Sequence, residues 1–443
     1  MFKRAKVKQT LLLIGDIGIL YAALFTMLFI RYGRITEEVR ELHIIPFSAL
    51  FFFALLIFYI MGFYELKFQK NTPEFTKKFF LLIGVNLLIA IIFFYFVPWF
   101  SITPKTNLFI FMFLFGTTSY IYRILFNNFL KVGIPSRQLL FIGHNQAFEE
   151  IATHLAANPQ LGYEIKFWAK EGLPDKESGH ISQLINTHGI DMIVIPAHIR
   201  KQSRSAQIIY QNLKHGIDVI SLTELYEIIF EKVPLTELEE EWFIEHLSHD
   251  RKIYDSLKRP CEVLFSTILL ILFSPIAIIV MLAIKLTSHG SAFFTQTRIG
   301  KNGDKFVLWK FRTMHVNAEK NGAQWAEPND SRQTGVGKFL RKTHLDELPQ
   351  LFNIVSGDLS LVGPRPERPE FTGMLEKEIP FYPLRHLVRP GLTGWAQIKY
   401  RYGASLDDSY EKAQYDIYYL KNRGFLFDVS IVLKTIKLFF VSA

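Results

Sequence analysis

Cysteine is almost absent from this sequence, which has one cysteine, Cys261, in 443 residues. A single thiol excludes an intrachain disulfide and any metal site built from several cysteine ligands. A dinucleotide-binding fingerprint is also missing, because Gly143 supplies only the first glycine of the G-x-G-x-x-G pattern. The net charge is +9, but no nucleic-acid-binding motif accompanies it. The charge therefore favours anionic lipid surfaces and phosphorylated small molecules as partners, and no nucleic acid.

Long apolar runs are what the sequence has in abundance. Hydrophobic residues make up 49% of the chain, and phenylalanine occurs 42 times. Four runs in residues 1–131 approach the roughly 20 residues that cross a bilayer core. They cover residues 10–30, 44–63, 79–97 and 108–126 and predict four transmembrane helices. The first run is too long for a signal peptide and lacks a small-residue cleavage site, so we interpret it as a retained anchor.

Basic residues fix the expected orientation of these helices. The N-terminal tail and the loop between the second and third runs are basic, whereas the other two loops are not. By the positive-inside rule, the tail and the second loop are cytoplasmic, and so is the chain after the fourth run. Asp16 lies inside the first run, where we favour a structural role facing the other helices over a functional one.

Residues 138–240 alternate short apolar strands with helical patterns, which predicts a parallel, Rossmann-like α/β domain. Its first turn reads Gly143-His144-Asn145-Gln146 and lacks the glycines that let a pyrophosphate approach. We therefore interpret this domain as structural, regulatory or homodimer-forming rather than as an NAD site.

Residues 262–286 form another apolar run, which is interrupted by Ser274-Pro275 and has basic residues on both flanks. Proline removes one backbone hydrogen bond and kinks a helix, and Ser274 can satisfy the carbonyl that is freed. Taken alone, these residues fit a kinked spanning helix and a re-entrant helix equally well.

A pair of adjacent carboxylates, Asp346 and Glu347, precedes Pro349. Because proline is tolerated in the first turn of a helix, we expect a helix that starts near Leu345. Free backbone N–H groups and the helix dipole would then favour ionised carboxylates, which can act as nucleophiles or metal ligands. An acidic pair at a helix start is common, so the surrounding motifs have to decide its role.

Five motifs occur in one order around this pair. They read Gln296-Thr297-Arg298-Ile299-Gly300, Lys310-Phe311-Arg312-Thr313-Met314, Leu345-Asp346-Glu347-Leu348-Pro349-Gln350, Gly363-Pro364-Arg365-Pro366 and Arg389-Pro390-Gly391-Leu392-Thr393-Gly394-Trp395. With them, the chain from about Lys258 to its C-terminus resembles the bacterial sugar transferase family, the monotopic phosphoglycosyl transferases. The resemblance is to undecaprenyl-phosphate glucose or galactose phosphotransferases. His344 departs from the family pattern, which usually has a small polar residue there.

The resemblance implies transfer of a sugar-1-phosphate from a UDP-hexose to undecaprenyl phosphate, which starts lipid-linked polysaccharide synthesis. Asp346 would form a phospho-aspartate and release UMP, and Glu347 would bind Mg²⁺. The bacterial inner membrane is the implied location, with the catalytic domain on its cytoplasmic face. The expected phosphate contacts are Arg298, Lys310, Arg312, Arg341, Arg365 and Arg389.

Cytoplasmic nucleotide sugars also favour the re-entrant form of 262–286, because a spanning helix would carry the carboxylates outside. Residues 258–443 are then an α+β catalytic domain that ends in an interfacial helix at 425–441.

Two alternatives stay open. A membrane-bound nucleotide-sugar dehydratase or epimerase would use a Tyr-x-x-x-Lys pair, and Tyr254 and Lys258 have that spacing. A non-catalytic membrane scaffold or sensor is the second alternative, although the intact carboxylate pair and Arg365 argue against it. The reaction product separates the three: a lipid-linked phosphosugar, an altered nucleotide sugar, or nothing.

Overall fold

The computed structural model describes residues 2–97, 105–132, 136–170, 187–196, 217–247, 251–316, 318, 330–400, 403 and 405–441. The chain divides into two compact units, Met1–Leu222 and Thr223–Ala443. Each unit is described by itself.

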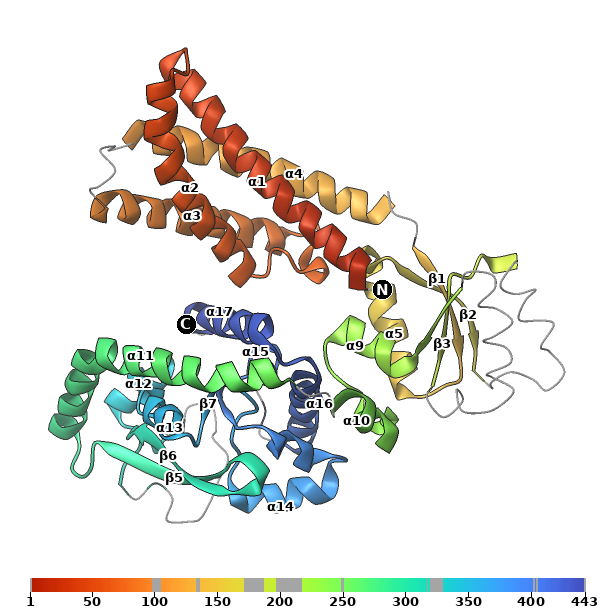
Figure 1. Ribbon diagram of the computed structural model, residues 1–443, viewed down its shortest axis with the longest axis vertical. Coiled ribbons are helices and arrows are strands. Elements are labelled where there is room, and N and C mark those ends of the chain that lie inside the picture. The colour runs from red at the N-terminus through yellow and green to blue at the C-terminus, as the bar shows by residue number, and fades with distance from the viewer. Residues whose placement is uncertain are drawn as a thin grey trace. The chain divides into compact units, whose positions relative to one another are not determined.

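Four long helices open the first unit, and they pack as a bundle (Figure 1). They are α1 (Phe2–Tyr32), α2 (Glu37–Ile60), α3 (Pro73–Phe96) and α4 (Lys105–Val132). Thr36 and Thr72 begin α2 and α3 by accepting hydrogen bonds from Val39 N and Phe75 N. Inside the bundle, phenylalanine rings pack on one another, with Phe47, Phe58, Phe79 and Phe115 fully buried.

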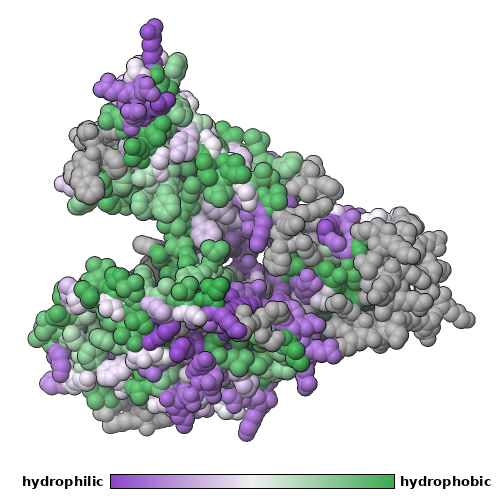
Figure 2. Space-filling model, in the orientation of Figure 1, coloured by the Kyte–Doolittle hydropathy of each residue, from purple (hydrophilic) through white to green (hydrophobic). Residues whose placement is uncertain are grey.

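The face of the bundle that Figure 2 shows is largely apolar as well. Phe113 and Phe96, for example, are 73% and 72% exposed. A helix that is apolar on every side is typical of a membrane span, and all four helices are long and apolar enough to cross a bilayer. The prediction of a membrane protein with four N-terminal apolar helices is confirmed.

A buried ion pair joins α1 to α4. The Asp16 carboxylate accepts hydrogen bonds from Arg123 Nη2 at 2.5 Å and from the Tyr64 hydroxyl at 2.9 Å. Arg123 also donates to the Phe63 carbonyl and lies over the Phe58 ring. Neither Asp16 nor Arg123 is exposed. Asp16 therefore has the structural, bundle-facing position that the sequence favours.

A parallel sheet follows the bundle. Its strands are β1 (Arg137–Ile142), β2 (Tyr163–Ala169), β3 (Met192–Ile195) and β4 (Asp218–Ser221), in the order β2-β1-β3-β4. Asn145 caps helix α5 (Gln146–Ala157), which follows β1. The predicted parallel four-strand domain is confirmed.

The α/β domain packs against the second loop of the bundle. The short helix η1 (Leu66–Phe68) meets η2 (Pro159–Leu161), and Leu161 packs against the core of the bundle. Lys70 Nζ donates to the Ala157 carbonyl at 3.0 Å. The second loop and the α/β domain therefore lie on one side of the bundle, as the charge pattern predicts.

The second unit begins with α9 (Leu222–Phe230), η3 (Leu235–Glu237) and α10 (Glu240–Leu247). The sequence grouped 223–240 with the α/β domain, but Val233, Leu235 and Leu238 pack in one core with Ile417 and Tyr419. Because these apolar side chains pack against the C-terminal half of the chain, the boundary between the two units lies at Leu222. The remaining elements are α11 (Lys252–Thr287), β5 (Phe293–Ile299), η4 (Lys301–Gly303), β6 (Lys305–Phe311), α12 (Gly335–Thr343), η5 (Leu345–Glu347), α13 (Gln350–Ser356), β7 (Ser360–Val362), α14 (Pro369–Glu378), η6 (Tyr382–Leu387), β8 (Gly391–Thr393), α15 (Trp395–Lys399), α16 (Leu406–Asn422) and α17 (Phe425–Val441).

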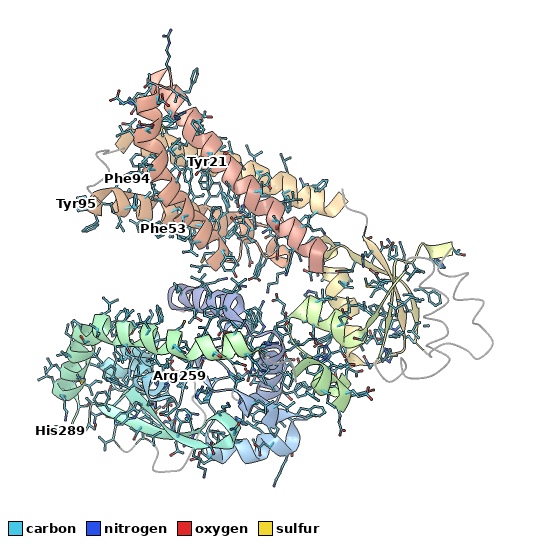
Figure 3. The ribbon with its side chains drawn as sticks, viewed as in Figure 1. Tyr21, Phe53, Phe94, Tyr95, Arg259 and His289 are labelled. Carbon is cyan, nitrogen blue, oxygen red and sulfur yellow. The ribbon has the colours of Figure 1, made fainter. Side chains whose placement is uncertain are left out.

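Helix α11 is a fifth apolar helix, and its ribbon is bent between its two ends (Figure 1). Pro275 has no N–H to offer the Ile271 carbonyl, and Ser274 Oγ bonds that carbonyl instead at 2.8 Å. Arg259 lies on the part of the helix before Pro275, and His289 follows the end of the helix (Figure 3). The expected helix break at Ser274-Pro275 therefore has the hydrogen-bond substitution that the sequence predicts.

Replacing Arg123 with methionine is expected to cost about 3–5 kcal/mol of stability, because it leaves the Asp16 carboxylate buried and unpaired. The double variant Asp16→Leu/Arg123→Met should recover most of that loss. The measurement is thermal unfolding in detergent followed by circular dichroism. Arg31→Met, at an exposed position of α1, is the control and should leave Tm unchanged.

Candidate active site

The carboxylate pair lies in a tight turn rather than in a long helix. His344 ends α12 with a left-handed backbone, at φ 54°, and the chain then forms the single 3₁₀ turn η5. Pro349 precedes α13, which begins only at Gln350. The helix expected to start near Leu345 therefore begins there as a 3₁₀ turn, and the α-helix itself begins only at Gln350.

Glu347 is the meeting point of three distant segments. Its Oε1 atom accepts from Lys310 Nζ at 2.8 Å and from Arg365 Nη2 at 2.9 Å. Lys310 comes from β6, and Arg365 comes from the loop after β7. Although burial opposes ionisation, the two cations hold the pKa of Glu347 well below its usual range. Glu347 is therefore ionised, and its carboxylate holds the Lys310 ammonium and the Arg365 guanidinium in place.

Asp346 is in the opposite electrostatic state. Its side chain is buried, and burial raises the pKa of its carboxyl, an effect that Glu347 reinforces and Lys310 partly offsets. Within the described residues, no group donates a hydrogen bond to this carboxylate. Asp346 is thus the more basic of the two carboxylates and keeps its oxygens available. Two neighbouring carboxyl groups whose pKa values are driven apart are typical of a catalytic pair.

The other expected phosphate contacts are distributed differently. Arg341 lies close enough to lower the pKa of Asp346 and bonds Thr313 Oγ1 at 3.0 Å. Arg312 instead donates to the Ser288 and His289 carbonyls at the end of α11. Arg389 donates to the Gly357 carbonyl, at the opposite end of α13 from the carboxylates. Lys310, Arg341 and Arg365 are therefore the predicted cations that the structure brings to the carboxylates.

Arg298 is engaged with backbone and neighbouring side chains. It bonds Gln296 Oε1 at 2.8 Å and the Pro366 carbonyl at 3.4 Å, and it pairs with Glu367 at 3.6 Å. Burial lowers the pKa of Arg298 to about 10. It supports the loop that carries Arg365, and it lies close enough to Glu347 for that carboxylate to act on its pKa.

Comparison with known proteins matches residues 253–442 to a family model described as bacterial sugar transferase. A UDP-glucose:undecaprenyl-phosphate glucose-1-phosphate transferase of Klebsiella pneumoniae is 32% identical over 360 residues, which are 76% of each chain. This chain belongs to the bacterial sugar transferase family. The resemblance seen in the sequence, and the enzyme class it implies, are confirmed.

Other relatives of this sugar transferase match a smaller share of it. A UDP-N-acetylgalactosamine-undecaprenyl-phosphate N-acetylgalactosaminephosphotransferase of Aeromonas hydrophila is 48% identical over 185 residues. A UDP-glucose:undecaprenyl-phosphate glucose-1-phosphate transferase of Escherichia coli K12 is 41% identical over 182 residues. The matched residues are 42% and 41% of this chain, and 44% and 39% of those relatives. The stretch that matches the family model, residues 253–442, contains the carboxylate cluster.

The sugar transferase offers few metal ligands. Within the described residues, no group of three or more His, Cys, Asp or Glu side chains could hold a metal. Asp346 and Glu347 supply two adjacent carboxylates, and Mg²⁺ usually takes one or two carboxylates together with substrate phosphates. The pair fits Mg²⁺ only in the company of a phosphorylated substrate.

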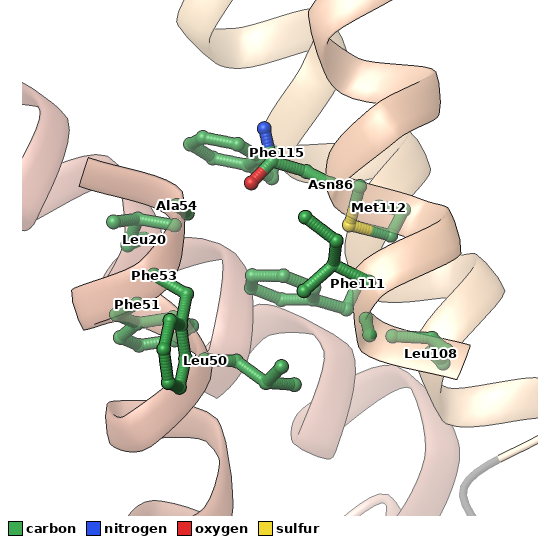
Figure 4. Close-up of a pocket in the computed structure, with 12 residues that line it drawn as sticks. Leu20, Leu50, Phe51, Phe53, Ala54, Asn86, Leu108, Phe111, Met112 and Phe115 are labelled. Atoms are coloured by element: carbon green, nitrogen blue, oxygen red, sulfur yellow. The ribbon is translucent and has the colours of Figure 1, made fainter. Parts of the chain in front are cut away.

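A pocket inside the helical bundle of the sugar transferase does not belong to this site. It is lined by apolar side chains and by Asn86 (Figure 4), and its volume of about 20 Å³ suits a single water. The bundle pocket therefore has neither the size nor the charge to bind a nucleotide sugar.

Lys310→Met is expected to move the acid limb of the activity profile to higher pH. Asp346 must be ionised to act, and Lys310 lowers its pKa, so removing this cation raises the pKa further. The measurement is kcat/KM for nucleoside monophosphate release as a function of pH. Lys310→Arg keeps the charge and should keep the limb in place; an unmoved limb in Lys310→Met would contradict the assignment.

Proposed function

We propose that this sugar transferase moves a sugar-1-phosphate from a UDP-hexose to undecaprenyl phosphate, releasing UMP and starting lipid-linked polysaccharide synthesis. The observation that carries the proposal is the buried Asp346 carboxylate beside a Glu347 that holds Lys310 and Arg365. The names of the relatives, which specify glucose and N-acetylgalactosamine donors, support the same substrate classes.

The proposed reaction has two displacements at one phosphorus. An Asp346 oxygen attacks the phosphorus that carries the sugar, the bond to the bridging oxygen breaks, and UMP leaves with the electron pair. The product is a phosphosugar on Asp346. An oxygen of undecaprenyl phosphate then attacks that phosphorus, the bond to Asp346 breaks, and a polyprenyl diphosphate sugar forms. The soluble donor and the lipid never need to bind together.

The cations of the site make an attack by one anion on another feasible. Arg365 and Lys310, fixed by Glu347, and Arg341 near Asp346 are placed to neutralise the transferred phosphoryl group. Bound Mg²⁺, held by Glu347, would add charge neutralisation on the diphosphate. The raised pKa of Asp346 makes it a stronger nucleophile than an exposed aspartate.

We propose further that α11 is re-entrant and returns to the cytoplasmic face. Its first arm bonds the catalytic fold, because Glu262 accepts from Ser360 Oγ and Leu361 N. Its second arm packs Val280 and Ile284 against Phe311 and Leu340 of the same fold. The ribbon bends between these two arms, and Pro275 lies in the stretch that separates them (Figure 1).

The outward side of α11 suits the bilayer. Ile271, Leu272 and Ile279 are 64–70% exposed around the break. The C-terminal helix α17 also exposes apolar residues, with Leu426 at 88%, and we assign it to the membrane interface. Together the two helices would hold the carboxylates near the lipid headgroups.

The α/β domain keeps a proposed structural, dimer-forming or regulatory role. The turn after β1 is closed by a 2.8 Å contact between His144 and Glu149. Glu149 is in the first turn of α5, where a bound pyrophosphate would need a neutral or positive neighbour. This arrangement does not favour a nucleotide there.

The dehydratase or epimerase alternative is not supported. Tyr254 and Lys258 are bonded to each other at 3.0 Å, but Lys258 also bonds Tyr419, Asp428 and the Val362 carbonyl. This partly buried network ties α11 to α16 and α17. Its groups are committed to structural partners.

Purified wild-type protein with undecaprenyl phosphate, Mg²⁺ and a panel of UDP-sugars is expected to release UMP with one sugar. Without the lipid, labelled UMP should exchange into that donor, and Asp346→Asn should abolish both reactions. Asp304→Asn, at an exposed position of the same unit, is the control and should keep both. Exchange by Asp346→Asn would exclude Asp346 as the nucleophile.

Cysteine labelling tests the re-entrant helix. In a Cys261→Ser background, Lys252→Cys and His289→Cys lie at the two ends of α11, and both positions are exposed. An impermeant thiol reagent should label both in inverted vesicles and neither in spheroplasts. Arg34→Cys, in the first loop, should show the opposite pattern. Labelling of the two α11 positions from opposite sides would show that α11 spans the bilayer.

A further inference from the structure

The loop that carries Arg365 is held by its carbonyl groups. Pro364 and Pro366 have no N–H donors, so at these two residues the backbone can form hydrogen bonds only through its carbonyl groups. The Pro364 carbonyl accepts from Gly391 N at 2.8 Å, and the Pro366 carbonyl accepts from Arg298 Nη1 at 3.4 Å. Between them, the Arg365 carbonyl accepts from Arg385 Nη2 at 3.0 Å.

Arg385 is itself immobilised. Its Nε and Nη2 atoms lie 3.0 and 2.7 Å from Asp416 Oδ2, and its Nη1 donates to the Tyr382 hydroxyl at 2.6 Å. Arg385 is 7% exposed and Asp416 is 1% exposed. The guanidinium is a rigid planar fork, and here it links η6, α16 and the Arg365 loop in one buried cluster.

The position of the Arg365 side chain depends on the fixed backbone of this loop. Its side chain is 49% exposed, and its one hydrogen bond to a side chain among the described residues goes to Glu347. A long, half-exposed side chain loses much conformational freedom when it holds one geometry. A fixed backbone carbonyl at the same residue reduces the positions that the guanidinium can reach, and misplacement of a phosphate-binding group by about 1 Å can cost 100-fold in rate.

We propose that Arg385, held by Asp416, is a positioning residue that fixes the Arg365 guanidinium toward the transferred phosphoryl group. The inference rests on the proposed function and extends it to a residue pair that does not touch the carboxylates. Arg385 acts only through Arg365. Its removal should therefore weaken transition-state stabilisation rather than donor binding.

Arg385→Lys keeps the charge but cannot reach Asp416, Tyr382 and the Arg365 carbonyl together. It is expected to lower kcat for UMP release about 10- to 100-fold while KM for the donor stays within about twofold. Asp416→Asn, which frees the guanidinium, should give the same pattern. It serves as the second variant if Arg385→Lys does not fold.

A double-mutant cycle separates positioning from general stability. In an Arg365→Ala background, Arg385→Lys should lower kcat by less than about twofold, because the residue it positions is gone. Glu227→Gln is the matched control, since Glu227 and Lys421 also form a buried ion pair with α16, at 2.8 Å. It should lower Tm as much as Arg385→Lys does and leave kcat unchanged.

The inference would be overturned if the losses in kcat caused by Arg365→Ala and Arg385→Lys multiplied in the double variant. It would also be overturned if Glu227→Gln, at the same loss of Tm, lowered kcat as much as Arg385→Lys does. A wild-type protein that forms no lipid-linked phosphosugar would instead refute the proposed function. The two failures are therefore distinguishable in one set of assays.

Discussion

The ion-pair cluster on Glu347 is the interaction on which the catalytic half depends. One carboxylate oxygen holds Lys310 and Arg365, and so it ties the end of an antiparallel hairpin to the loop after β7. The same contact lowers the pKa of Glu347, whereas burial raises the pKa of Asp346. The group that joins the segments also places positive charge beside the Asp346 carboxylate.

Much of the architecture could be predicted because it follows from the order of residues along the chain. Apolar runs of membrane length predict the four-helix bundle and α11, and alternation predicts the parallel sheet. Ser274-Pro275 predicts a break, since proline always frees the carbonyl four residues earlier and serine is close enough to bond it. Each of these features depends on residues that are close together in the sequence, so a single sequence is enough to predict it.

The sequence does not predict where individual side chains point or where the backbone turns. Lys310 and Arg312 belong to one motif, yet Lys310 points to Glu347 while Arg312 caps the end of α11. The left-handed backbone at His344 carries no mark in the sequence, so the turn before the carboxylates was not foreseen. Arg385 stands in no recognised motif, and only the fold brings it to the Arg365 carbonyl. Tertiary packing decides such contacts, and the spacing of residues does not contain them.

The bend in α11 has a consequence for the membrane itself. A helix that spans a bilayer adds equal cross-section to both leaflets, whereas a helix that turns back at Ser274-Pro275 would occupy one leaflet only. It would act as a wedge, expanding the cytoplasmic monolayer and leaving the opposite one relaxed. The lateral pressure of that monolayer would then act directly on the two arms of α11, so the shape of the surrounding lipids would become part of the enzyme's mechanical environment.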